Sequence, residues 1–262
     1  MAKRQLTDKR AILTGASSGI GWHLAQTLAA KKVKLVITAR RVERLLELQN
    51  LIVSAGGVCE IVAGDITEPK TRDQLIALAT SKFGGLDVLI NNAGIGAMGR
   101  FDEADPDRIR QVFEVNFFSA AELIRAAIPV LSEGNSPLIV NISSVLGHRA
   151  VPLKSEYSAS KFAMHGFSDA LRAELAEDGI HVQLISPSTI DSDFFDSAIE
   201  DNTGKSWKKP GAMPPQRVAS IIARVMRTNR HEATLSIGGK SLVWLDRLLP
   251  SLADRIIAKY AQ

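Results

Sequence analysis

The stretch TGASSGIG at residues 14–21 decides the fold, because it joins a short apolar run to a helical pattern through three glycines. Glycines at these places let the backbone turn tightly and approach a pyrophosphate closely. The helix that follows offers free N–H groups and the positive end of its dipole. The spacing GxxxGxG differs from the commoner fingerprint GxGxxG, and a glycine-rich turn alone is weak evidence. Its place at the first strand–helix junction favours a phosphate cradle with these contact residues: Gly15, Ser17, Ser18, Gly19, Ile20 and Gly21.

Outward from this stretch, short β-branched runs alternate with longer amphipathic patterns. The predicted strands are 10–14, 33–38, 58–63, 86–91, 138–142, 181–186 and 233–237. The predicted helices are 19–31, 41–55, 69–83, 106–131, 155–178 and 215–228. Such alternation requires right-handed crossovers and strands buried on both faces. The sequence therefore predicts a single α/β domain over residues 1–262, with a Rossmann-like, doubly wound parallel sheet of about seven strands and helices on both faces.

Composition and charge exclude several classes of protein. Of the 262 residues, 45% are hydrophobic and 23% are charged, as in an ordinary soluble domain. The net charge is only +4 and the basic residues are scattered, so we expect no nucleic-acid partner. The single cysteine, Cys59, allows no internal disulfide, has no partners for a metal site and fits a reducing compartment. No signal peptide is visible and no apolar run approaches the roughly 18 residues of a membrane span, so we expect a cytoplasmic protein.

The end of the second predicted strand reads TARR at residues 38–41 and bears on the choice of nucleotide. NAD-binding proteins usually place a carboxylate there to accept hydrogen bonds from the adenosine ribose. Here no acid follows the strand until Glu43, and Arg40, with Arg41 as a second candidate, can clamp a 2′-phosphate through its planar guanidinium. Alternatively, both arginines are solvated residues that open a helix. The sequence favours NADP(H).

Two further turns complete the expected nucleotide site. Asp65 and Ile66 follow the third predicted strand and are placed for the adenine. Asn92, Ala93 and Gly94 follow the fourth strand and form a turn beside the cofactor. Because the carboxyl ends of parallel strands lie at one edge of a sheet, both turns should face the glycine-rich stretch.

Four side chains form the candidate catalytic group. Lys161 lies four positions after Tyr157, so on a helix the two share a face, and the cation would lower the tyrosine pKa from about 10. Ser144 follows an apolar strand, where a parallel sheet gathers its reactive groups. Asn116 interrupts an apolar helix pattern and is therefore a functional suspect. A YxxxK pair alone is more often an exposed helix face, but the presence of Ser144 and Asn116 favours catalysis.

Together these motifs resemble the short-chain dehydrogenase/reductase family, in its branch of single-domain enzymes, over residues 10–237. The family's glycine motif corresponds to residues 14–21 and its NNAG motif to residues 91–94. Its catalytic tetrad falls on Asn116, Ser144, Tyr157 and Lys161, and family spacing selects Ser144 over the adjacent Ser143. One motif departs, because Pro187 is followed by serine where the family has glycine, and Ser192 replaces a threonine. Ser192 keeps a hydroxyl for the nicotinamide carboxamide, so we expect less loop freedom and no loss of cofactor binding.

The resemblance implies hydride transfer between nicotinamide C4 and a substrate carbon, with Tyr157 giving or taking the proton. Lys161 would lower the tyrosine pKa and bind the nicotinamide ribose, Ser144 would polarise the substrate oxygen, and Asn116 would hold a water of a proton relay. One alternative is an NADP(H)-binding redox sensor or interaction protein without turnover, which has no use for an intact tetrad. Another is a sugar-nucleotide epimerase or dehydratase, which needs a larger C-terminal domain.

The segment 188–213 is the longest irregular stretch, and we expect a partly mobile lid over the nicotinamide. Its apolar residues suggest a bulky hydrophobic ketone, aldehyde or secondary alcohol as substrate. The alternative is that they anchor the loop to the core. For His148, which is close to Ser144 in sequence, a surface role is favoured. The expected pocket residues are Phe194, Phe195, Ile199, Trp207 and Met213, together with Leu146 and Val151.

The tail at residues 239–262 reads as two short amphipathic helices separated by Pro250. Its apolar side needs a cover, which is the protein's own cleft, another subunit or a membrane surface. A small positive excess suits an anionic bilayer weakly, and packing on the protein itself or on a second subunit is favoured. By resemblance we expect a homodimer through the helices that carry Asn116 and Tyr157, or a homotetramer.

Overall fold

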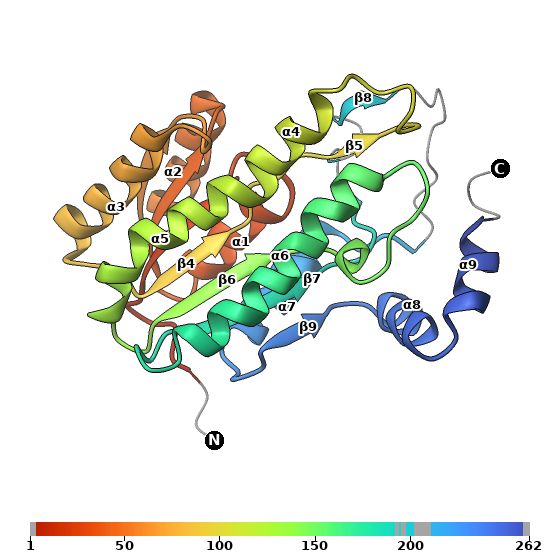
Figure 1. The fold of residues 1–262 in the computed structure, drawn as a ribbon. Coiled ribbons are helices and arrows are strands. Elements are labelled where there is room, and N and C mark those ends of the chain that lie inside the picture. Colours follow the sequence, from red (N-terminus) through yellow and green to blue (C-terminus); the bar gives the residue numbers. More distant parts are fainter. Residues whose placement is uncertain (1–3, 192–193, 195–197, 202–210, 259–262) are drawn as a thin grey trace.

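The computed structural model describes residues 4–191, 194, 198–201 and 211–258, and the statements below concern these residues. A seven-stranded parallel sheet forms the centre of the molecule (Figure 1). Its strands, in spatial order, are β3 (Val58–Ala63), β2 (Lys34–Ala39), β1 (Arg10–Thr14), β4 (Val88–Asn91), β6 (Leu138–Ile142), β7 (His181–Ser186) and β9 (Glu232–Thr234). The predicted fold class is confirmed, and β1, β3, β6 and β7 have the predicted bounds.

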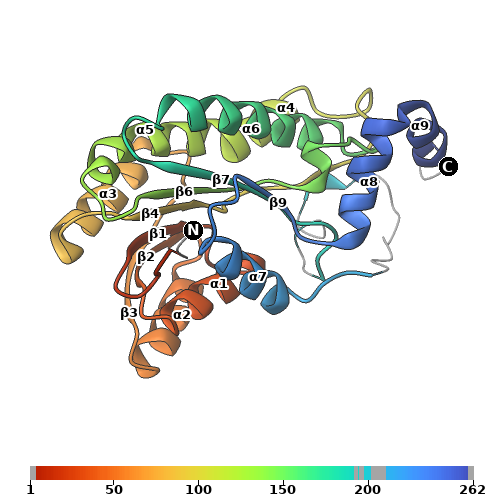
Figure 2. The same ribbon diagram turned by 90° about the horizontal axis from the view of Figure 1, so that it is seen from below.

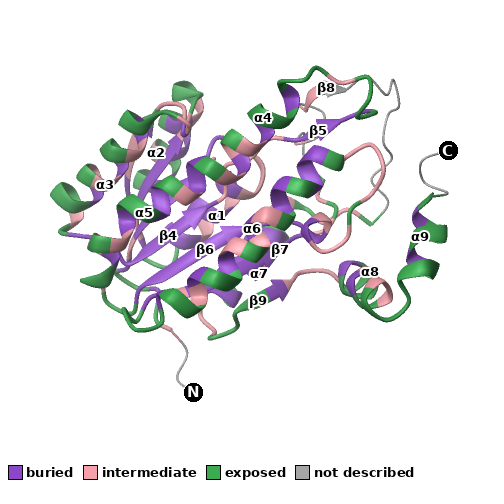
Figure 3. Ribbon diagram, viewed as in Figure 1, coloured by how far each residue is buried: buried purple, intermediate pink, exposed green. Residues whose placement is uncertain are grey.

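Helices cover both faces of the sheet in two layers (Figure 2). One layer contains α1 (Gly19–Ala29), α2 (Val42–Ser54) and α7 (Pro215–Val225). The other contains α3 (Pro69–Phe83), α5 (Ser119–Ser132) and α6 (Ser155–Glu174). Neighbouring strand residues point to opposite layers, so Leu13 belongs to the first core and Ile12 to the second. Strands β4 and β6 are buried along their whole length, which explains why they are apolar except for Asn91 and Asn141 (Figure 3).

The order of the strands positions the functional site. From β1 the chain moves outward to β2 and β3, and it then crosses back to β4 on the other side of β1. The loops that leave the carboxyl ends of β1 and β4 therefore turn in opposite directions. In open parallel sheets ligands bind at this reversal.

The helix predicted at 106–131 is interrupted at Asn116. The structure has α4 (Arg108–Phe113), a π-helical turn (Glu114–Phe118) and then α5. A single π-helical turn inside an α-helix is frequently found at functional sites. The segment Arg108–Ser132 contains an 18-residue window with a mean hydropathy of 1.3, and by length and composition alone it could span a membrane. However, α5 buries Leu123 and Leu131 against the sheet, as the core helix of a globular domain does.

The described residues of the segment 188–213 include a short strand that the sequence did not predict. The strand is β8 (Ile199–Asp201), which pairs in parallel with β5 (Ala97–Met98) in a small separate sheet. Strands of two or three residues are too short to show a periodicity, so no sequence pattern predicts them. Met213 forms a bridge with Ile190 and packs against the core, which is the anchoring role considered above. Phe195 and Trp207 lie outside the described residues.

The C-terminal segment forms two helices, α8 (Ile237–Leu248) and α9 (Pro250–Ala258). The last strand ends earlier than the predicted 233–237, because Ser236 caps α8 by accepting a hydrogen bond from the Gly239 N–H at 2.9 Å. Arg149 binds Asp246 of α8 at 2.9 Å and also Asp254 of α9, so the tail packs on its own chain. Apolar side chains remain exposed on these helices: Ile237, Trp244, Leu248, Leu249, Leu252 and Ile256.

Candidate active site

The glycine-rich loop after β1 and the turn after β4 are held together at the carboxyl edge of the sheet. The Thr14 hydroxyl accepts hydrogen bonds from the backbone N–H groups of Asn92 at 3.0 Å and Ala93 at 2.9 Å. In return, the Asn92 side-chain amide donates to the carbonyls of Thr14 and Gly15 at 2.9 and 3.1 Å. The two predicted cofactor motifs therefore form one rigid unit.

Two glycines of this loop are required by close packing. Gly15 has a φ of +68°, and a Cβ there would lie 2.8 Å from the Ala93 Cα. A Cβ on Gly21 would lie 2.2 Å from the Gly15 carbonyl oxygen. Ser18 is the extended N-cap of α1, and its side chain makes no capping hydrogen bond there. The first turn of α1, with Gly19 and Ile20, thus presents backbone donors and a positive dipole end to an anion, as a phosphate cradle requires.

The arginine that reaches this loop is Arg41. Its guanidinium donates to the Ser17 hydroxyl from Nε at 3.2 Å and from Nη2 at 2.9 Å. Arg40, the first candidate from the sequence, is exposed and no hydrogen bond to the loop is recorded for it among the described contacts. Arg44 lies over the Trp22 ring, 4.1 Å from its centroid. The geometry therefore favours Arg41 over Arg40 as the contact for a nucleotide phosphate.

Asp65 lies two residues beyond β3 and caps its own turn. Its Oδ1 accepts hydrogen bonds from the Thr67 N–H at 3.0 Å and from the Thr67 hydroxyl at 2.9 Å. Ile66 beside it is buried in the core. The second carboxylate oxygen of Asp65 is left for other donors, which is compatible with the expected place of the adenine.

Tyr157, Ser144 and Lys161 come together where β6 ends and α6 begins. The Tyr157 hydroxyl is hydrogen-bonded to Ser144. The Ser144 Oγ also accepts the Leu146 N–H at 3.1 Å and so caps the short 3₁₀ turn Val145–Gly147. The Lys161 Nζ donates to the Ile142 carbonyl at 3.0 Å and lies 5.7 Å from the centroid of the Tyr157 ring. All three side chains are buried.

Asn116 belongs to the same group through the turn after β4. Its Oδ1 accepts the Ile95 N–H at 2.8 Å, and its Nδ2 donates to the Ile95 carbonyl and the Ser160 hydroxyl, each at 3.0 Å. A Cβ on Gly94 would lie 3.1 Å from the Asn116 Oδ1 and 3.7 Å from the Lys161 Nζ. The structure thus brings all four tetrad residues together, and the π-helical turn places the amide where it can bond Ile95 in both directions.

Burial dominates the acidity of the two ionisable tetrad residues. It raises the pKa of Tyr157 to about 12, and the hydrogen bond with Ser144 acts in the opposite direction. It lowers the pKa of Lys161 to about 8. Burial of the phenolate thus acts against the expected lowering of the tyrosine pKa by Lys161.

The remaining predicted site residues lie around the turn after β6. The Pro187 carbonyl accepts the Val145 N–H at 2.9 Å and supports the turn that carries Ser144. The Phe194 ring stands edge-on to the Tyr157 ring, with centroids 5.7 Å apart, so Phe194 borders the predicted catalytic tyrosine. Leu146 and Val151 are half-buried nearby in the sequence. Ser192 lies outside the described residues.

Sequence reasoning missed a buried ion pair directly beside the catalytic tyrosine. Arg108 of α4 donates to the Glu156 Oε1 from Nε at 2.8 Å and from Nη2 at 2.6 Å. Their side chains are 0% and 2% exposed. Glu156 stands next to Tyr157 in the sequence, but nothing in the sequence shows that its side chain points inward. The surface role favoured for His148 is also wrong, because its side chain is 2% exposed.

Comparisons with known proteins agree with this geometry. A family model described as short chain dehydrogenase matches residues 9–203. Dehydrogenase/reductase SDR family member 7B of Mus musculus is 38% identical over 270 residues, covering 100% of this chain and 84% of that protein. The ketoacyl reductase HetN of Nostoc sp. is 31% identical over 258 residues, covering 96% of this chain and 88% of that protein. The chain therefore belongs to the short-chain dehydrogenase/reductase family and is an oxidoreductase of that family.

Solved structures show the same fold. A short chain dehydrogenase from Burkholderia cenocepacia in complex with NADP is 29% identical, with a TM-score of 0.79, and the match covers 90% of this chain and 100% of that one. A short chain dehydrogenase/reductase from Burkholderia phymatum in complex with NAD has a TM-score of 0.86 at 24% identity, covering 95% of this chain and 96% of that one. The second likeness bears on the fold alone.

Proposed function

We propose that this protein is an NADP(H)-dependent oxidoreductase that interconverts a carbonyl and an alcohol on a bulky hydrophobic substrate, with Tyr157 as acid and base. The observation that carries the proposal is the buried group of Tyr157, Ser144 and Lys161 next to the glycine-rich loop. The hydrogen bond between Tyr157 and Ser144 gives a carbonyl oxygen two hydroxyl groups to bind. The relative from Burkholderia cenocepacia, whose structure holds NADP, supports a nicotinamide cofactor.

When bound, a nicotinamide cofactor supplies or accepts the hydride. Tyr157 keeps its proton at neutral pH, since its pKa is raised to about 12, and is ready to donate it to the substrate oxygen during reduction. Ser144 donates to the same oxygen and fixes its position. Both amide hydrogens of Asn116 already bond Ile95 and Ser160, so a relay water at this residue has to bond its backbone carbonyl or the remaining lone pair of its Oδ1.

The pH dependence of reduction follows from Lys161. Its pKa of about 8 lies far below that of Tyr157, so the ammonium is the group that titrates in the accessible range. We expect kcat/KM for carbonyl reduction to be level at low pH and to fall as the pH rises through about 8, because Lys161 loses its charge. The Lys161→Arg variant keeps its positive charge over this pH range, so the fall in kcat/KM should disappear or move to higher pH. A wild-type profile that stays flat to high pH contradicts this role.

Arg41 is expected to set the preference for NADP(H). A guanidinium that binds a phosphate makes charge-assisted hydrogen bonds worth about 1.5–3 kcal/mol. The Arg41→Ala variant should therefore bind NADPH about 10–100-fold more weakly, with little change for NADH. Arg44→Ala is the matched control, since Arg44 packs on the Trp22 ring and pairs with Glu47. The Arg40→Ala variant tests the first candidate separately. Comparable wild-type kcat/KM values for NADPH and NADH refute the preference.

A screen of ketones and aldehydes of graded size tests the substrate class. With NADPH as reductant, kcat/KM should rise as apolar substituents grow, because each buried methylene adds up to about 1–3 kcal/mol of discrimination. The Phe194→Ala variant should lose activity on the bulky members and little on the small ones, since Phe194 borders Tyr157. Turnover of small polar carbonyls alone would overturn the substrate class. No turnover of any carbonyl would favour the alternative of a non-catalytic NADP(H)-binding protein.

We also propose a cytoplasmic homodimer that pairs through the helical segments carrying Asn116 and Tyr157. Phe118 and Phe162 on these segments are 48% and 44% exposed, which is a large apolar surface for a monomer. Replacing both by serine should convert the dimer to a monomer in a sizing experiment. Truncation after Gly239 tests what covers α8 and α9. If a second subunit covers them, the truncated protein should lose its oligomeric state in a sizing experiment. If a membrane covers them, only the full-length protein should float with anionic liposomes.

A further inference from the structure

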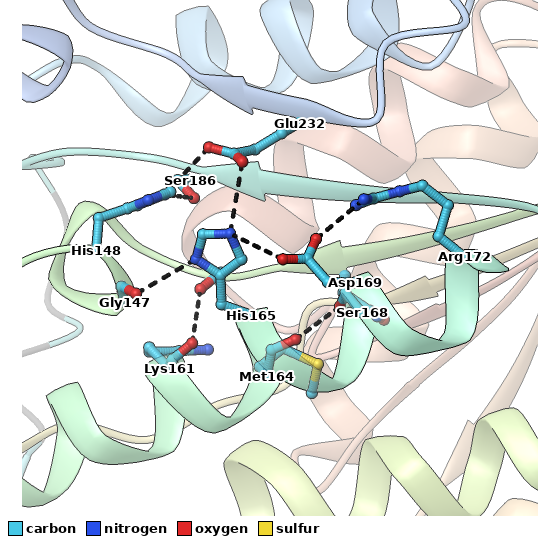
Figure 4. A network of polar contacts seen from close by, with 12 residues as sticks. Gly147, His148, Lys161, Met164, His165, Ser168, Asp169, Arg172, Ser186 and Glu232 are labelled. Atoms are coloured by element: carbon cyan, nitrogen blue, oxygen red, sulfur yellow. Dashed lines mark hydrogen bonds and ion pairs between the residues drawn. The ribbon is translucent and has the colours of Figure 1, made fainter. Parts of the chain in front are cut away.

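Three metal-ligating side chains converge behind the turn that carries Ser144 (Figure 4). His148 follows the turn Val145–Gly147, His165 lies in α6 one helical turn after Lys161, and Glu232 opens β9. No role in the proposed reaction draws on any of them. Their ligand atoms all lie within 4.8 Å of one another.

The separations suit an ion better than direct hydrogen bonds. The His148 Nε2 lies 3.6 Å from one oxygen of Glu232, and the His165 Nε2 lies 3.4 Å from the other. Both separations are longer than the about 2.7–2.9 Å of a short charge-assisted hydrogen bond. Around tetrahedral zinc, with ligand bonds of about 2.0–2.2 Å, neighbouring ligand atoms lie roughly 3.4 Å apart. Each separation, measured to a different oxygen of Glu232, is close to that spacing.

The cluster of His148, His165 and Glu232 is buried on one side and accessible to solvent on the other. The His148, His165 and Glu232 side chains are 2%, 16% and 35% exposed, so the cluster opens gradually toward the surface. A surface pocket lies against it, lined by Gly147, His148, Phe162, His165, Gly166, Asp169 and Arg247. Asp169 is 3.9 Å from the His165 Nε2 and is held by Arg172 at 3.0 Å. The Ser186 hydroxyl lies 2.9 Å from the His148 Nε2, within hydrogen-bond distance.

We propose that His148, His165 and Glu232 form a binding site for one divalent transition-metal ion of the zinc type, with water as the fourth ligand. Two imidazoles and one carboxylate suit zinc, cobalt or nickel, whereas magnesium and calcium prefer sites made of oxygen alone. The ion joins the turn after Ser144 to α6 and β9. It therefore fixes the catalytic serine relative to the helix that carries Tyr157 and Lys161.

The test uses the full chain after treatment with a chelator. Titration with Zn²⁺ alone in a calorimeter should show one equivalent of tight binding, and Zn²⁺ should raise the melting temperature. Co²⁺ should give the intense visible absorption of a tetrahedral site. Mg²⁺ at the same concentration should show neither effect.

Substitutions of the proposed ligands test where the ion binds. His165→Gln and Glu232→Gln each remove one ligand and should weaken Zn²⁺ binding by at least about 10–100-fold, the loss known for outer-shell changes alone. His231→Gln is the matched control, because His231 forms a second histidine pair with His181, with ring centroids 5.0 Å apart, outside this cluster. The proposal is overturned if the wild type does not bind Zn²⁺, if both ligand variants bind it as tightly as the wild type, or if His231→Gln abolishes binding.

Discussion

Replacing Tyr157 with phenylalanine should lower kcat for carbonyl reduction by at least about 10²–10⁴-fold, the usual loss when a general acid is removed. The ring and its packing against Phe194 remain, while the hydroxyl that bonds Ser144 is lost. The glycine-rich loop that receives the nucleotide is untouched, so the Kd for NADPH should barely change. Steady-state kinetics and a fluorescence titration of NADPH measure the two quantities separately.

The chain has two tyrosines, and Tyr260→Phe is the matched control for this experiment. It makes the same chemical change far from the tetrad in sequence and should leave kcat at the wild-type value. Turnover of Tyr157→Phe close to that of the wild type would show that another group donates the proton. A parallel loss of NADPH binding would instead point to damage of the whole site.

Breaking the buried pair of Arg108 and Glu156 should give the largest loss of stability. In Arg108→Leu, the Glu156 carboxylate stays buried without its counter-ion, and a broken buried pair costs about 3–5 kcal/mol. The melting temperature of a chain of this size should fall by about 10 °C. Thermal unfolding followed by circular dichroism measures the change. The same variant should lower activity, because Glu156 directly precedes Tyr157.

Two controls separate this effect from the loss of any charge. The double variant Arg108→Leu/Glu156→Leu removes both charges and should recover much of the stability, since apolar replacements of a whole buried pair are often neutral. Arg100→Ala removes an arginine that pairs with Asp102 and Glu103 on the surface, where the three side chains are 59–65% exposed, and it should leave the melting temperature unchanged. If Arg108→Leu melts like the wild type, the buried pair does not stabilise the fold.

The sequence predicted the sheet well because its strands are buried on both faces. β6 is apolar except for the buried Asn141, and the strand has the predicted bounds. The strands β5 and β8 were missed because their pairing depends on segments about a hundred residues apart and on no local pattern. The π-helical turn at Asn116 was missed for a similar reason, since it is stabilised by the backbone of Ile95.

The residues of the candidate site could be predicted from the sequence, but their pKa shifts and side-chain directions could not. Spacing alone placed Tyr157 and Lys161 on one helix face, and the structure brings Ser144 and Asn116 to them. The direction of the pKa shifts depends on how much water reaches the two side chains, which no spacing reveals. Choosing Arg41 over Arg40 likewise required the direction of each side chain, because the two arginines are adjacent in the sequence.

The two ion pairs of Arg149 have a consequence for protein synthesis. Asp246 and Asp254 follow Arg149 in the chain by 97 and 105 residues. At about 5–20 residues per second, a ribosome adds them roughly 5–20 s after the catalytic turn. During that interval the nascent chain exposes a turn without its final support. Premature termination before Asp246 would therefore leave Arg149 without both of these carboxylates, even though every tetrad residue had already been translated.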